Sequence, residues 1–185
     1  MRMTTPKALV ALVCSALLGA AASAAPANLF IKTGETIVVR VGADGAMSVE
    51  SRAAAPPLSG FEQSALAQMQ AALAQVPPDA KTLPAMPILG PKDTKVPDIR
   101  PNSVRLTFRA VAGGSEAMLW IENGYDGAFR YRAVMHRGER SAPTDVCQVM
   151  PKKPGAEHWP FQIERLELSE ARLEPWQDGQ GIRCQ

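Results

Sequence analysis

Two histidines and a few nearby carboxylates are the side chains of this sequence best suited to acid–base chemistry. His136, Glu139 and Asp145 fall close together in the chain, and His158 follows in a second polar stretch. Hydrolytic catalysis would require such groups to converge in one pocket, so these four residues define a candidate loop site in segments 136–144 and 151–160. The sequence has no Gly-x-Ser-x-Gly motif and no His or Cys pairs at zinc-ligand spacing. It therefore favours a binding protein without a cofactor, with a hydrolase as the alternative.

Arginines recur at alternate positions in the middle of the chain, where they would share one face of a β-sheet. The residues concerned are Arg105, Arg109, Arg130 and Arg132, and Trp120 falls between them in the sequence. If their strands lie in one sheet, these side chains form a basic patch with an indole ring in cation–π contact. Such a patch suits an anionic group on a protein, a lipid or the cell wall.

The alternative for the same arginines is a solvated face without a role in binding. Ion pairs with Glu116, Glu122, Glu164 or Glu167 would neutralise them, and exposed pairs of this kind contribute little to stability. In that arrangement Trp120 packs in a second layer of the core. The ionic contacts of the four guanidinium groups decide between the two interpretations.

The N-terminus has the pattern of a secretory signal peptide over residues 1–24. Arg2 and Lys7 precede an uncharged run that is too short to span a bilayer, and Ala22-Ser23-Ala24 provides a small-x-small cleavage site. We expect cleavage after Ala24, export to the periplasm and no transmembrane segment in the mature chain.

Export changes the charge and the cysteine count of the protein. The first 24 residues hold two basic residues and no acidic one, so the mature chain has 18 of each and lacks the net positive charge of a nucleic-acid-binding protein. Its two cysteines, Cys147 and Cys184, are expected to form a disulfide in an oxidising compartment. Closing this loop would stabilise the fold by about 4 kcal/mol.

The longest stretch with an apolar residue at every second position runs from Ser103 to Met135 and predicts the main antiparallel sheet. Glycine-containing turns at 113–114 and 123–124 divide it. Polar loops are expected at 136–144 and 151–160, with a strand at 146–149 between them. The apolar phase then slips between Ile163 and Leu166, which indicates a bulge or two short elements.

The first half of the mature chain predicts smaller elements. Residues 29–41 fit a hairpin around Thr33-Gly34, followed by a turn at 42–45 and a short strand at 47–49. Ser59 and Glu62 fit a capping box at the start of an amphipathic helix from about Gly60 to Gln75. Seven prolines between positions 77 and 101 then predict an extended connector.

Several runs in the second half resemble a group of small exported bacterial proteins of unknown role. These runs are Leu119 to Tyr125, Phe129 to Met135, Asp145 to Cys147 and Glu157 to Pro160, and the likeness extends over roughly residues 104–176. The resemblance implies a periplasmic β-sandwich-like domain with a bridge at Cys147. It implies no particular activity.

Together these patterns predict a mainly β protein, an antiparallel immunoglobulin-like β-sandwich with an N-terminal hairpin and one amphipathic helix. A partly open β-barrel is the alternative. The expected division of the chain is a signal peptide at 1–24, a hairpin region at 25–52, a helix and proline-rich connector at 53–101, and the main sandwich domain at 102–185.

Overall fold

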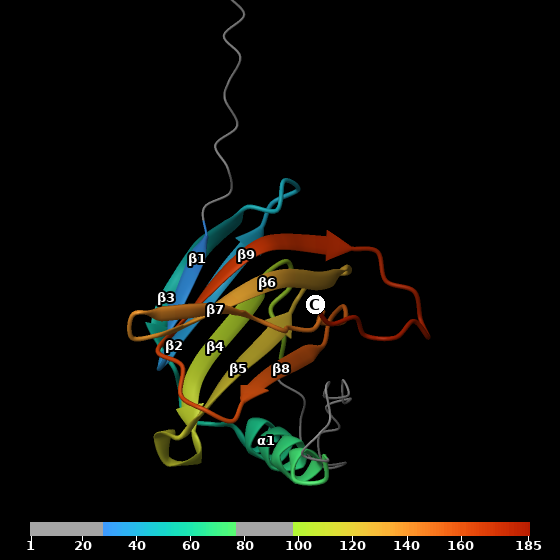
Figure 1. The fold of residues 1–185 in the computed structure, drawn as a ribbon. Helices are drawn as coiled ribbons and strands as arrows, with labels where there is room; N and C mark the ends of the chain where they lie inside the picture. The colour runs from blue at the N-terminus through green and yellow to red at the C-terminus, as the bar shows by residue number, and fades with distance from the viewer. Residues whose placement is uncertain (1–27, 77–97) are drawn as a thin grey trace, which may run out of the picture.

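Two antiparallel sheets face each other and one helix covers part of the outside, as a computed structural model shows for residues 28–76 and 98–185 (Figure 1). The structure therefore confirms a mainly β sandwich with a single helix over the described residues. The predicted signal peptide and residues 77–97 of the predicted connector lie outside them.

The larger sheet has five strands in the order β3-β2-β4-β5-β8. Their bounds are β2 Glu35–Val41, β3 Met47–Ala54, β4 Val104–Val111, β5 Glu116–Asn123 and β8 Pro154–Trp159. A short 3-10 turn, η1 Ala112–Gly114, joins β4 to β5. The second sheet has the order β1-β9-β6-β7, with β1 Leu29–Lys32, β6 Ala128–Arg137, β7 Arg140–Thr144 and β9 Arg165–Glu174.

The core lies between the two sheets and follows the predicted alternation. Phe108 of β4 and Leu119 of β5 are fully buried there, together with Phe129 and Tyr131 of β6, whose rings stack at 5.1 Å. Trp159 of β8 meets Phe108 edge-on at 6.3 Å. Burying large apolar side chains from both inner faces is what holds two such sheets together.

The predicted hairpin around Thr33-Gly34 is wrong, because this turn joins strands of different sheets. β1 pairs with β9 in the four-stranded sheet, whereas β2 pairs with β3 and β4 in the five-stranded sheet. The N-terminal hairpin is instead formed by β2 and β3 around the turn at 42–46, and β3 is longer than predicted. Alternation identifies a strand but does not say which sheet it joins.

Both polar segments predicted as loops are largely strands. Residues 136–144 contain the end of β6 and all of β7, which pair around a tight turn at Gly138, and residues 154–159 form β8 at the edge of the five-stranded sheet. Edge strands with an exposed face hold few apolar residues, so the apolar pattern misses them. In contrast, the predicted strand at 146–149 makes only isolated bridges, to Phe129 and Cys184.

Helix α1, Gly60–Leu73, packs on the outer face of the five-stranded sheet (Figure 1). The predicted capping box is confirmed: the Ser59 hydroxyl accepts a hydrogen bond from the Glu62 amide, and the Glu62 carboxylate accepts one from the Ser59 amide. Phe61 and Met69 bury their side chains against Met118 and other residues of the sheet. The helix is thus a second, smaller hydrophobic layer outside the sandwich.

The C-terminal tail is fixed to the four-stranded side of the sandwich by a disulfide between Cys147 and Cys184, as predicted. Backbone hydrogen bonds between Val146 and Gln185 flank the bond on one side. The Gln185 side chain donates a hydrogen bond to the Tyr131 carbonyl at 2.7 Å and accepts from Arg130. The last residues of the chain therefore belong to the folded domain.

Candidate functional site

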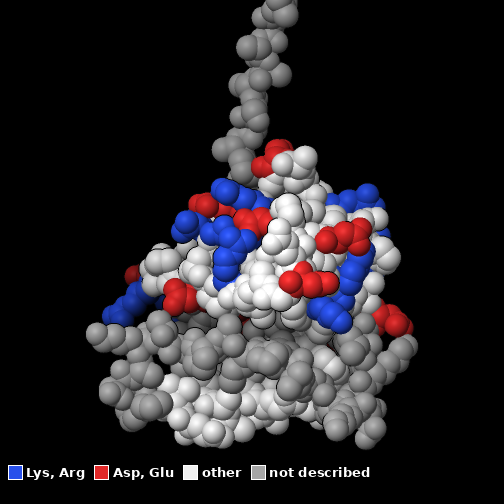
Figure 2. Space-filling view, turned by 90° about the vertical axis from the view of Figure 1, so that its right-hand side faces the viewer, with Lys and Arg blue, Asp and Glu red and all other residues white. Residues whose placement is uncertain are grey.

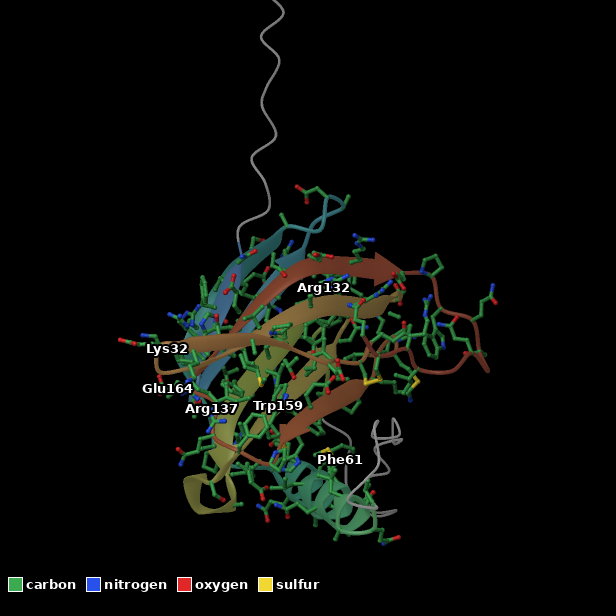
Figure 3. The ribbon with its side chains drawn as sticks, in the orientation of Figure 1. Lys32, Phe61, Arg132, Arg137, Trp159 and Glu164 are labelled. Carbon is green, nitrogen blue, oxygen red and sulfur yellow. A yellow bond between two sulfur atoms is a disulfide. The ribbon has the colours of Figure 1, made fainter. Side chains whose placement is uncertain are left out.

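The four arginines of the predicted basic patch do not share a surface. Arg105 and Arg109 lie on the outer face of β4 in the five-stranded sheet, whereas Arg130 and Arg132 lie on the outer face of β6 in the four-stranded sheet. These outer faces point in opposite directions, as the positions of Arg132 and of Phe61 on the helix show (Figure 3). Alternation placed the arginines correctly on outer faces, but the strands belong to different sheets.

Each of these arginines has a carboxylate partner. Arg105 pairs with Glu122 at 3.0 Å, as the alternative interpretation predicted, while the partners of the other three are glutamates that it did not include. The remaining pairs are Arg109 with Glu62 at 3.1 Å, Arg130 with Glu174 at 3.0 Å and Arg132 with Glu170 at 2.9 Å. On the face that Figure 2 presents, basic and acidic side chains are interspersed.

The Arg109–Glu62 pair is buried beneath the helix. Both side chains are 9% exposed, and the Arg109 guanidinium also donates a hydrogen bond to the Pro56 carbonyl at 2.7 Å. Burial lowers the pKa of Arg109, and the charge of Glu62 opposes that shift. Trp120 lies in the same layer, with its ring edge-on to Phe61 at 5.7 Å. This layer attaches the helix to the sheet, so Trp120 packs in a second layer of the core.

The two histidines of the candidate loop site lie on opposite sides of the sandwich. His136 is on the outer face of β6, where Nε2 lies 3.0 Å from Glu167 and Nδ1 lies 3.2 Å from the Arg165 guanidinium. Because a guanidinium only donates, Nδ1 accepts the hydrogen bond from Arg165 and Nε2 donates one to the Glu167 carboxylate. These contacts hold the His136 ring in a closed network of side chains.

His158 lies on the outer face of β8, next to the C-terminal half of α1. Its Nε2 is 2.7 Å from Glu116, which also accepts a hydrogen bond from Gln70 of the helix at 3.0 Å. These hydrogen bonds, first from Gln70 and then from His158, lower the pKa of Glu116. Glu139 and Asp145 are exposed in the turn after β6 and after the end of β7. The four predicted residues therefore do not converge in one pocket.

Sequence reasoning missed a carboxyl group inside the sandwich. Glu157 of β8 points toward the core, since it pairs in register with Leu119 and precedes the buried Trp159 by two residues. Burial raises the pKa of Glu157 to about 8, and a hydrogen bond from the Cys147 amide at 2.6 Å opposes this shift. Burial and the charge of Glu157 both raise the pKa of Tyr131. The sequence did hold one signal: Glu157 lies two residues before Trp159, and on a strand this spacing places both side chains on the same face.

An open depression lies at the end of the sandwich where the β2–β3 turn and the β5–β6 loop come together. We call it the end groove, and its volume is about 590 Å³. Its lining is Arg40, Val41, Gly42, Ala46, Ser48, Asn102 and Tyr125. None of these residues was a predicted site residue, because four separate segments of the chain supply them. Concave surfaces with a few polar groups are the usual place for a ligand.

Tyr125 is held in the wall of the end groove at both ends of the residue. Its backbone amide donates to the Asn123 side chain at 3.1 Å, and its hydroxyl accepts from the Val41 amide at 3.0 Å. Asn123 is fully buried, and its side-chain amide nitrogen lies within hydrogen-bond distance of three backbone carbonyls, to which its two N–H groups donate. At Gly124 a Cβ atom would lie 1.8 Å from the Arg100 carbonyl oxygen, so only glycine fits. The Asn-Gly-Tyr sequence therefore builds a rigid groove wall.

Residues 28–76 and 98–185 contain neither a cluster of metal ligands nor a helix that could span a membrane. In these ranges no three His, Cys, Asp or Glu side chains come together in a way that could hold a metal ion. None of the helices in the same ranges has the length and apolar character needed to cross a membrane.

Comparison of the chain with protein-family models, with curated proteins and with solved structures finds no match in any of the three.

Proposed function

We propose that this chain is an exported, periplasmic binding module that holds its ligand in the end groove. The observation that carries the proposal is the position of Tyr125, an aromatic side chain fixed at both ends in the wall of a concave surface. A side chain that is already ordered loses little conformational freedom when it contacts a ligand. Such preorganisation is characteristic of binding sites built on a rigid scaffold.

The disulfide supports export. Cys147 and Cys184 are bonded in the structure, and such bonds persist in oxidising compartments such as the periplasm. The signal-peptide pattern of residues 1–24 agrees with this location.

The ionic contacts on the two outer faces favour the end groove over the basic patch. Arg105, Arg109, Arg130 and Arg132 all have carboxylate partners, so an anionic protein, lipid or cell-wall group would have to displace an existing ion pair at each of them. The separation of His136 from His158 favours binding over hydrolysis, because a catalytic pair must share one pocket.

A photo-crosslinking amino acid at position 48 tests the proposal in living cells. Ser48 is exposed at the end groove. Glu139 is exposed in the turn between β6 and β7, outside the groove lining, and serves as the control position. We expect a discrete adduct from position 48 and none from position 139. Equal labelling at both positions, or no adduct from either, would contradict the assignment of the groove as a binding site.

A further inference from the structure

We infer that the ligand of the end groove is a neutral saccharide, an inference that rests on the proposed binding function. A sugar ring has apolar C–H faces and hydroxyl groups around its edge. The groove lining combines the same two properties: Ala46 and the Tyr125 ring are apolar, while Ser48, Asn102 and the Tyr125 hydroxyl are polar. The side chain of Val41 is buried in the core, so this residue contributes its backbone to the lining. A purely apolar ligand would leave the polar groups of the lining without hydrogen bonds, and a purely polar ligand would leave its apolar groups without a packing partner.

The polar groups of the lining are available for a ligand. Among the described residues, the Ser48 hydroxyl and the Asn102 amide group have no hydrogen-bond partner, and both residues are exposed. The Tyr125 hydroxyl accepts from the Val41 amide, which leaves its own proton free to be donated. Together these groups offer both donors and acceptors, as the hydroxyl groups of a sugar require.

An ion pair already occupies the charged side chain of the groove lining. Arg40, the only basic side chain in the lining, is held in an ion pair by Glu50. Glu50 also pairs with Arg100 at 3.1 Å, so one carboxylate lies between the two guanidinium groups. An anion would compete with Glu50 for the Arg40 guanidinium, whereas a sugar hydroxyl can accept a hydrogen bond from it without disturbing the pair.

The groove is also rigid at the position of its amide donor. Asn102 has a backbone φ of 53°, a conformation that favours asparagine and glycine, and its backbone N–H donates to the Gly124 carbonyl at 2.9 Å. Replacing Asn102 with glycine therefore preserves the backbone while removing only the side-chain amide. This gives a variant that tests ligand contact without unfolding the loop.

Titration calorimetry of the mature, disulfide-bonded protein with defined oligosaccharides tests the inference. The probes are maltotetraose, cellotetraose and tetra-N-acetylchitotetraose as neutral ligands, and tetragalacturonate as the anionic one. We expect saturable binding of at least one neutral probe. The variant carrying Asn102→Gly and Ser48→Ala should bind it about tenfold more weakly or worse, since two hydrogen bonds are lost. The control Ser141→Ala, on exposed strand β7, should bind it as the wild type does.

Three results would overturn the inference: no binding of any neutral probe at millimolar concentration, binding of tetragalacturonate alone, or equal binding by wild type and double variant. If position 48 still forms a discrete crosslink in cells, the groove binds a ligand of another class and the proposed function survives. If both experiments fail, the proposed function fails with the inference.

Discussion

Replacing Glu157 with glutamine should change how the stability of this protein depends on pH. Burial raises the pKa of this carboxyl group from 4.5 to about 8 in the folded state. Between these values the folded protein binds a proton that the unfolded chain has released. The folded state therefore binds the Glu157 proton more tightly than the unfolded chain does. As a result, the free energy of unfolding falls as pH rises from about 5 to about 8.

The size of this effect follows from the pKa shift. One pKa unit corresponds to about 1.4 kcal/mol, so a rise of three pH units within the window costs about 4 kcal/mol at most. Water that reaches the ionised carboxylate would reduce this figure. In Glu157→Gln the amide oxygen can still accept the hydrogen bond from the Cys147 amide, but the side chain does not ionise. The pH-dependent loss attributable to residue 157 should then disappear.

Urea unfolding of the wild type and Glu157→Gln at several pH values between 5 and 8, with the disulfide intact, measures this difference. Glu139→Gln, at an exposed turn, is the matched control and should keep the wild-type slope. Because other groups titrate in the same range, the quantity of interest is the difference in slope between variant and wild type. Equal slopes for these two proteins would refute the placement of the Glu157 carboxyl group in the core.

Three further results are expected. Intact-mass measurement of the periplasmic protein should give a chain that starts at Ala25 and exposes two alkylatable thiols only after reduction; free thiols before reduction would contradict the disulfide. Phe108→Ala should lower the free energy of unfolding by about 3 to 5 kcal/mol, since Phe108 is fully buried. Glu62→Ala should cost about 3 to 5 kcal/mol because it leaves the buried Arg109 charge unpaired, whereas Arg132→Ala on the exposed face should cost less than about 1 kcal/mol.

Local patterns predicted the elements whose residues carry their own signal. The alternation around Phe108 and Leu119 gave the strands and their buried face, and Ser59 with Glu62 gave the start of the helix. The disulfide was predicted from the expected export and from the presence of only two cysteines after residue 24. These predictions depend only on neighbouring residues or on composition, and so they can be made from a single sequence.

Features that depend on pairing between distant segments could not be predicted in the same way. The turn at Thr33-Gly34 looks like a hairpin, yet β1 pairs with β9 at the far end of the chain. Arg105 and Arg130 have the same alternating pattern, but their strands belong to different sheets. The strand β8 contains few apolar residues because it lies at an edge, and its inward Glu157 interrupts the pattern further.

The end groove could not be predicted from the sequence for the same reason, because it also depends on distant segments coming together. Its lining comes from four segments, and its residues have no common motif that a sequence pattern would identify. Only the Asn-Gly-Tyr run was visible in the sequence. The structural role of this run depends on contacts of Asn123 and Tyr125 with segments that are far away along the chain.

Mapping of backbone amide shifts by NMR tests most directly whether the end groove is the binding site. The labelled mature protein would be titrated with the neutral tetrasaccharides, and the amides that shift with saturation would be placed on the structure. We expect them to cluster at residues 40–48, at Asn102 and at Tyr125. Saturable shifts confined instead to the outer face of β6 and β9, or no saturable shift anywhere, would contradict the groove as the site of binding.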